Sequence, residues 1–272
     1  MSIAQIILML LEYPARLYAK TQKKFPNVLP SNLLKITNTP KSPFTKFLMK
    51  LKIYALTNDF EPIVKNELLF FLKNRKEVGG FKLIKVMGNI LSLLKKTEGI
   101  KGDVIELGIA SGATTIMMAH FLKQINSKRK IYGCDTFEGL PYKDKFSKMS
   151  SKNVIGKFSH SLDFVHTKFK KFNVDDKIIL VKGLFEDTLY SELAEKQFSF
   201  VFIDCDLYDA TKYSLDFVWP RLSKNGFIIF DNYGGGARNL ERGTWGETKA
   251  ADEFCAEKKI KLHLYPEPML IK

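Results

Sequence analysis

DVIELGIASGATT, residues 103–115, is the stretch of sequence that decides the fold. Its first part, Val104 to Leu107, is apolar except for Glu106 and is typical of a buried β-strand, and a helix-like run follows Gly112. Gly108 and Gly112 allow the backbone to turn sharply and to approach a ligand closely. The segment therefore predicts a binding loop, although a plain tight turn has the same pattern. Its E-x-G-x-x-x-G spacing matches neither the G-x-G-x-x-G dinucleotide loop nor a P-loop.

After residue 100, strand-like and helix-like patterns alternate along the chain, which indicates a parallel, doubly wound α/β sheet. Strand patterns lie at 104–107, 130–134, 178–182, 198–203, 227–230, 261–265 and 269–272. Helical patterns lie between them at 114–124, 160–171, 187–194, 209–219 and 248–258. We therefore predict a seven-stranded, mostly parallel, Rossmann-like sheet over residues 100–272, with its ligand at the carboxyl ends of the strands.

Residues 1–99 are predicted to form an N-terminal helical appendage and connector. Asp59 is the predicted N-cap of a helix with Pro62 in its first turn and Gly79-Gly80 at its end, and a second helical period spans 81–96. An apolar run at 3–11 has about ten residues, far fewer than the roughly twenty that a membrane span needs. We expect this run to pack on the body or on a second subunit of a homo-oligomer.

The composition is that of a folded protein with a basic surface. Of 272 residues, 45% are hydrophobic, and the formal net charge is +14, from 43 Lys and Arg against 29 Asp and Glu. The lysines are scattered and no arginine-rich block interleaved with aromatic residues is present, so no nucleic-acid partner is expected. The 3 cysteines lie far apart without metal-ligand spacing, which argues against zinc and a disulfide framework and favours a cytoplasmic location.

Two further strand ends carry candidate cofactor contacts. Asp135 follows the second strand, about twenty residues beyond the glycine loop, where a carboxylate can accept hydrogen bonds from both hydroxyls of a ribose. It could instead be an N-cap for the following turn. Gly183 ends the third strand and opens the run GLFEDTL, in which Phe185 could stack on an adenine or belong to the core.

Acidic residues gather at the ends of the next two strands. Asp204 and Asp206 follow one strand and Asp231 and Asn232 follow the other, with no basic residue in either sequence run. Such a cluster is electrostatically costly when nothing compensates its charge. A set of oxygen ligands of this kind is what Mg²⁺ selects, so we predict a magnesium site, with separate solvent-facing caps as the alternative.

The motifs VIELGIASGATTIMMAHFL, YGCDTFEGLP, GLFEDTL, FIDCDLYDAT, GFIIFDNYG and KAADEF follow one another in this order. Together they resemble the class I S-adenosylmethionine-dependent O-methyltransferases of the macrocin O-methyltransferase type, which methylate sugar hydroxyls in antibiotic pathways. The resemblance covers about residues 59–272 and is strongest over 100–255. Catechol O-methyltransferases share the E-L-G loop and the Asp…Asp-Asn set as a more distant resemblance.

The resemblance implies contacts for the cofactor, S-adenosylmethionine. Its methionine part would lie against Gly108, Ser111 and Gly112, its ribose on Asp135 and its adenine near residues 183–185. We also assign four more residues to the cofactor site: Glu106, Thr136, Phe137 and Asp204.

The resemblance also implies the chemistry. Asp204, Asp231 and Asn232 would hold Mg²⁺, and Asp206 would be the general base. The family often has a second aspartate where this chain has Asn232, and the lysine of the catechol enzymes would fall at Leu207, which weakens a catechol assignment. A hydroxyl bound to Mg²⁺ loses its proton more readily, and a nearby carboxylate can accept that proton.

We therefore predict a Mg²⁺-dependent O-methyltransferase that moves a methyl group from S-adenosylmethionine to a hydroxyl of a sugar or glycosylated small molecule. A catechol or phenol acceptor is the alternative within the enzyme class. A cofactor-binding or glycan-binding module without catalysis is the alternative outside it.

Overall fold

The computed structural model describes residues 53–54, 56–80, 82–144, 146, 154–234 and 246–272. The helix predicted at 3–11 lies outside these residues. Two helices, α4 (Pro62–Val78) and α5 (Ile84–Lys96), come first. The alternating elements that follow are β1 (Asp103–Leu107), α6 (Ala113–Gln124), β2 (Ile131–Asp135), α7 (Leu162–Lys171), a short 3₁₀ turn (Asp175–Lys177), β3 (Ile178–Lys182), α8 (Phe185–Leu193), β4 (Phe198–Ile203), α9 (Tyr208–Arg221), β5 (Leu222–Phe230), α10 (Gly246–Lys258) and β6 (Met269–Ile271).

The six strands form one sheet in the order β3-β2-β1-β4-β5-β6. Neighbours among the first five strands run parallel, and β6 runs antiparallel to β5. The chain order reverses between β1 and β4, and a sheet of this kind binds its ligand beyond the carboxyl ends of the strands at such a reversal. The predicted doubly wound, mostly parallel sheet is confirmed.

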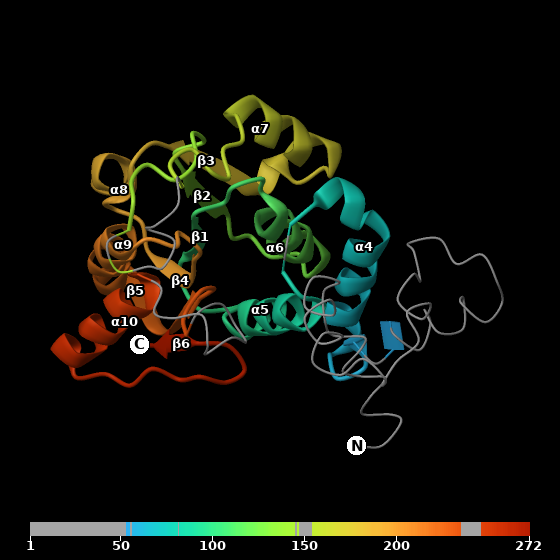
Figure 1. The fold of residues 1–272 in the computed structure, drawn as a ribbon. Helices are drawn as coiled ribbons and strands as arrows, with labels where there is room; N and C mark the ends of the chain where they lie inside the picture. The colour runs from blue at the N-terminus through green and yellow to red at the C-terminus, as the bar shows by residue number, and fades with distance from the viewer. Residues whose placement is uncertain (1–52, 55, 81, 145, 147–153, 235–245) are drawn as a thin grey trace, which may run out of the picture.

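Helices cover both faces of the sheet, with α4, α5 and α6 on one side and α8, α9 and α10 on the other (Figure 1). Side chains of a strand alternate between its two faces, and β4 shows this plainly. Phe200 and Phe202 belong to the core cluster shared with α4, α5 and α6, whereas Val201 and Ile203 belong to the cluster shared with α8, α9 and α10. Burial on both faces explains why this strand is a continuous apolar run in the sequence.

The two helices before residue 100 pack directly on the α/β body. Leu68 of α4 and Met87 of α5 lie in the same apolar cluster as Ile116 of α6. The N-cap of α4 is Glu61, not the predicted Asp59, because the helix starts only at Pro62. The helix ends at Gly79, whose φ of 71° is in the left-handed region that glycine adopts without strain. The division of the chain into two domains at residue 100 stays a prediction.

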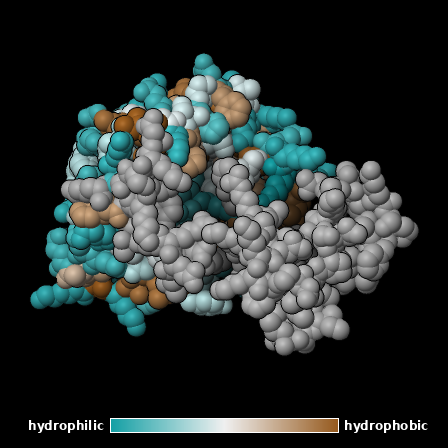
Figure 2. Space-filling model, viewed as in Figure 1, coloured by the Kyte–Doolittle hydropathy of each residue, from teal (hydrophilic) through white to brown (hydrophobic). Residues whose placement is uncertain are grey.

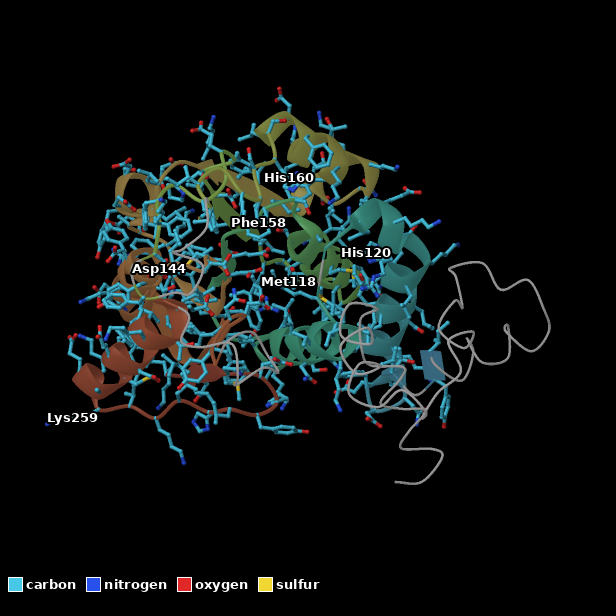
Figure 3. All side chains as sticks on the ribbon, viewed as in Figure 1. Met118, His120, Asp144, Phe158, His160 and Lys259 are labelled. Atoms are coloured by element: carbon cyan, nitrogen blue, oxygen red, sulfur yellow. The ribbon has the colours of Figure 1, made fainter. Side chains whose placement is uncertain are left out.

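A polar contact also joins α4 to α6. Figure 3 shows His120 on the side of α6 that faces α4, and its Nδ1 lies 2.6 Å from Oε2 of the buried Glu67. The His120 ring stacks on Phe70 of α4, with ring centroids 3.9 Å apart. Burial, opposed by the hydrogen bond and charge of His120, raises the pKa of Glu67.

The strand count differs from the prediction. Of the seven predicted strands, the stretch 261–265 forms only an isolated bridge, from His263 to Met269, in the described part of the chain. Leu264 and Tyr265 are 68% and 86% exposed, and Pro266 has no N–H to continue a ladder. With little burial and this single bridge as its backbone pairing, the stretch does not extend into a strand.

The amino-terminal edge of the sheet is held by a buried arginine. Arg129, just before β2, donates to Oγ1 of Thr97 at 2.8 Å, to Oγ of Ser199 at 3.1 Å and to the carbonyl of Leu94 at 3.2 Å. It also forms an ion pair of 2.6 Å with Glu98. These contacts connect the end of α5 with the first residues of β2 and β4.

The described surface is largely hydrophilic in the view of Figure 2, with apolar residues in small, separate patches. Within the described residues, no helix has the length and apolar character required to cross a membrane.

Candidate active site

The glycine loop predicted from the sequence lies at the carboxyl end of β1. Gly108 follows the strand with φ of 91°, and Gly112 is the left-handed N-cap of α6 with φ of 73°. A Cβ on Gly108 would lie 2.3 Å from the backbone oxygen of Asp204, so only glycine fits there. The loop backbone therefore passes directly against Asp204, the residue that follows β4. This contact brings the predicted cofactor loop and the acidic cluster to one point.

Asp135 holds the glycine loop in place. Its Oδ2 accepts hydrogen bonds from the backbone N–H groups of Ile109 and Ala110, both at 2.9 Å, and its Oδ1 accepts one from Phe137 at 2.8 Å. Ala110 itself has a positive φ of 45°. The carboxylate thus fixes the loop conformation, a role that the sequence analysis missed. Its predicted contact with a ribose stays a prediction; Oδ1, which accepts only the hydrogen bond from Phe137 among the described residues, has a further lone pair for such a contact.

The residues after β2 and β3 lie beside this loop. The hydroxyl of Thr136 donates to the carbonyl of Gly139 at 2.8 Å, and the side chain of Phe137 is buried. The N–H of Gly183 donates to the carbonyl of Asp135 at 3.0 Å, which places the end of β3 next to the end of β2. Phe185 is buried in the core cluster on the α8–α9 side of the sheet. Contacts of these residues with a cofactor stay predictions.

Glu106, within β1, is buried at 1% exposure. Its Oε2 accepts a hydrogen bond of 2.6 Å from the hydroxyl of Thr115 in α6. Burial, opposed by this hydrogen bond, raises the pKa of Glu106 to about 8. The side chain therefore ties β1 to the helix after the glycine loop.

The predicted acidic cluster is assembled by strand pairing. Ile203 of β4 lies opposite Phe230 of β5, so Asp204 and Asp231 leave the sheet side by side. Asp206 has a φ of 62°, and its Oδ1 accepts a hydrogen bond of 2.7 Å from the amide nitrogen of Asn232. Burial, followed by the charge of Asp231, raises the pKa of Asp206 to about 6 and that of Asp204 well above its usual range. The four residues that the sequence predicts to lie together therefore form one cluster: Asp204, Asp206, Asp231 and Asn232.

Lys82 compensates the charge of this cluster, which the sequence analysis missed. Its Nζ lies 2.7 Å from Oδ2 of Asp204 and 2.9 Å from Oδ1 of Asp231. Its side chain is 12% exposed, and Nζ is 5.0 Å from the ring centroid of Phe202. Burial alone would lower the pKa of Lys82, but the charges of Asp204 and Asp231 outweigh it and raise that pKa.

Glu247, at the start of α10, is a second member that the sequence analysis missed. Its side chain is fully buried, and its Oε1 accepts a hydrogen bond of 2.7 Å from the backbone N–H of Asn232. Its Oε2 has no hydrogen-bond partner among the residues that the structure describes. Burial raises the pKa of Glu247 well above the usual range. Glu247 directly precedes the helix predicted at 248–258, and nothing in its sequence surroundings indicates this role.

The arrangement does not fit the predicted magnesium ion. Mg²⁺ lies about 2.0–2.1 Å from its oxygen ligands, and an ion bridging Asp204 and Asp231 would need the place that Nζ of Lys82 takes. Asn232 turns its amide nitrogen, not its oxygen, toward Asp204 and Asp206. Within the described ranges, no three His, Cys, Asp or Glu side chains are grouped to hold a metal ion.

A sheet that reverses its order between β1 and β4, with a glycine turn after β1 and a carboxylate after β2, defines the class I methyltransferase fold. Solved structures confirm this fold. The chain superimposes on the O-methyltransferase NovP with a TM-score of 0.60 at 20% identity, covering 84% of this chain and 98% of that one. For the calicheamicin methyltransferase CalS11 the TM-score is 0.57 at 20% identity, with 86% and 94% covered.

Within this class, the chain belongs to the Macrocin-O-methyltransferase family, whose match spans residues 80–264. It is 30% identical over 145 residues to a Streptomyces olivaceus protein, the 8-demethyl-8-(2,3-dimethoxy-alpha-L-rhamnosyl)-tetracenomycin-C 4'-O-methyltransferase, covering 50% of this chain and 54% of that protein. It is 29% identical over 145 residues to the mycinamicin III 3''-O-methyltransferase of Micromonospora griseorubida, covering 50% and 57%. The matched region thus spans little more than half the length of these relatives.

Proposed function

We propose that this chain transfers the methyl group of S-adenosylmethionine to a hydroxyl of a sugar or of a glycosylated small molecule. Membership of the family supports the reaction, and a relative named for its action on a rhamnosyl-bearing tetracenomycin supports the class of acceptor. The observation that carries the proposal is the contact between Gly108 and Asp204, which joins the cofactor loop to the carboxylate cluster. A methyl donor bound at this loop would therefore lie at the same end of the sheet as the proton acceptor proposed in the cluster.

The chemistry follows from these positions. The acceptor oxygen attacks the methyl carbon, the carbon–sulfur bond breaks, and its electron pair stays on sulfur to give S-adenosylhomocysteine. The hydroxyl proton passes to the carboxylate of Asp206, which Asn232 orients through the bond of 2.7 Å. The sulfonium methyl is already electrophilic, so the main task of the protein is to align donor and acceptor.

The sequence-based prediction assigns Mg²⁺ a part in this reaction. When bound, the ion would make the acceptor hydroxyl more acidic. Because Lys82 takes its place between Asp204 and Asp231, we assign no step of the transfer to an ion.

An open cavity beside α10 suits part of a sugar-containing acceptor. Its volume is about 430 Å³, and it is lined by Phe146, Lys249, Asp252 and Glu253. The Phe146 ring packs on Tyr208, with centroids 4.5 Å apart, and Tyr208 follows Asp206 by two residues. The carboxylates that line the cavity, Asp252 and Glu253, can accept hydrogen bonds from the hydroxyls of a sugar.

The test is methyl transfer from labelled S-adenosylmethionine to a panel of sugar nucleotides, glycosides and catechols. Asp206→Asn keeps the side-chain size but removes the proton acceptor, so we expect turnover to fall by about 10²–10⁴-fold while S-adenosylhomocysteine binds within a few-fold of its original affinity. Asp209→Asn is the matched control, because Asp209 is exposed and lies three residues after Asp206; this change should leave turnover unchanged. Full activity of Asp206→Asn would remove Asp206 from the mechanism, and turnover of catechols alone would favour the phenolic acceptor.

A further inference from the structure

Lys82 reaches the acidic cluster through an unusual connector. It lies between α4 and α5, and the two residues at the start of this connector, Gly79 and Gly80, have φ values of 71° and 84°. A Cβ on Gly80 would lie 2.7 Å from the Cβ of Ala113, at the start of α6. The connector therefore runs against the helix that follows the glycine loop. A residue with a Cβ in place of Gly80 would collide with Ala113. The connector places Lys82 at the ends of β4 and β5.

The ammonium of Lys82 has the contacts expected of a cation built into the site. It donates a hydrogen bond to Asp204, which lies 122 residues later in the sequence. It also forms an ion pair with Asp231, which follows the neighbouring strand β5. These are two of the three side chains that the sequence assigns to magnesium. The lysine stem is buried against the Phe202 ring, so the ammonium is not a surface group that swings freely in solvent.

The charges of the Asp204 and Asp231 carboxylates also favour a lysine ammonium between them over a bound metal ion. Two carboxylates next to each other need a positive charge, and Lys82 supplies it in a place with little water. The third predicted ligand, Asn232, adds no negative charge, and its amide nitrogen already donates to Asp206. A divalent cation would have to displace a buried ammonium that has two carboxylate partners.

We propose that the ammonium of Lys82 replaces the divalent cation in this chain, so that Asp204 and Asp231 are held in position for methyl transfer without a bound metal ion. Lys82 is then a positioning residue that acts through these two carboxylates. This inference rests on the proposed function for its catalytic consequence, which is transfer that persists in EDTA. Occupation of the cation position by lysine is measured separately, without turnover.

The experiment is a titration of the purified protein with Mn²⁺, in which electron paramagnetic resonance measures the concentration of the free ion. We expect the wild-type protein to bind Mn²⁺ with a dissociation constant in the millimolar range or weaker. Lys82→Met keeps the length of the side chain but removes its charge, and it should bind one Mn²⁺ at least tenfold more tightly. Lys85→Met, an exposed lysine of α5 three residues away, is the matched control and should behave as wild type.

Each outcome of the Mn²⁺ titration supports or overturns the proposed role of Lys82. Tight binding by Lys82→Met that is lost again when Asp204→Asn is added would support the proposal. Micromolar binding of one Mn²⁺ by the wild type, sensitive to Asp204→Asn, would overturn it, and this arm holds even if Lys82→Met fails to fold. Weak binding by both wild type and a folded Lys82→Met would show that lysine replaces no ion. Failure of the proposed function is recognised differently, by the absence of S-adenosylhomocysteine binding or of methyl transfer.

Discussion

Replacement of Asp135 by alanine tests whether this carboxylate holds the glycine loop. In the folded chain it accepts three backbone hydrogen bonds of 2.8–2.9 Å, from Ile109, Ala110 and Phe137. Ile109 and Phe137 are buried at 4% exposure each, so water cannot easily replace the lost acceptor. We therefore expect Asp135→Ala to unfold more easily than the wild type.

The magnitude follows from the three bonds. A hydrogen bond contributes about 0.5–1.5 kcal/mol net, and more when one partner is charged. At about 1 kcal/mol each, the three bonds of Asp135 give a loss of about 3 kcal/mol in the free energy of unfolding. In a chain of this size that loss lowers the melting temperature by roughly 6–12 °C.

The assay is urea unfolding followed by circular dichroism, with S-adenosylhomocysteine titrated into the same samples by calorimetry. Glu138→Ala is the control, because Glu138 lies three residues away at an exposed position. Among the described residues, its side chain forms only a surface ion pair of 3.4 Å with Lys182. Its effect should stay within about 0.5 kcal/mol. A change of less than about 1 kcal/mol in Asp135→Ala, with cofactor affinity lost, would refute the loop-holding role and leave the ribose contact as the explanation.

Two further predictions concern β1 and its loop. Because burial raises the pKa of Glu106 to about 8, above its value of 4.5 in the unfolded chain, the folded chain keeps this proton and loses stability as the pH rises between these two values. Glu106→Gln imitates the protonated form. Between about pH 5 and pH 8, its free energy of unfolding should therefore fall by roughly 3–4 kcal/mol less than that of the wild type; equal slopes in urea titrations would contradict this. Gly108→Ala should destabilise the chain by more than about 2 kcal/mol in urea unfolding, because its Cβ would lie 2.3 Å from the oxygen of Asp204. Gly99→Ala, at φ of 88° with nothing within 4 Å, carries the backbone strain alone and should cost only about 1 kcal/mol.

The sequence predicted well those features that depend on local pattern. The strands Ile178–Lys182 and Phe198–Ile203 have the predicted bounds. The second of them is buried along its whole length, so it is a continuous apolar run that ends at a polar residue. The meeting of Asp204 with Asp231 was predictable for a related reason, since parallel strands end at the same edge of the sheet.

Features that depend on distant parts of the chain were not predictable in this way. Lys82 is one of many lysines in the sequence, and nothing in its neighbourhood indicates that it meets Asp204, 122 residues later. The same is true of Glu247, whose contact with Asn232 depends on how α10 packs. The stretch 261–265 has the apolar alternation of a strand but lacks the burial and pairing partners that would make it one.

The buried arginine at the amino-terminal edge has a consequence for how this protein can change during evolution. Arg129 connects Thr97, Glu98 and Ser199, all at the end of the sheet opposite to the glycine loop and the carboxylates. This anchor is therefore separate from the residues that we propose to contact the cofactor and the acceptor. Loops at the carboxyl edge can accumulate insertions and substitutions without disturbing that anchor. Descendants of such a chain can acquire new acceptors while they retain the same folded body.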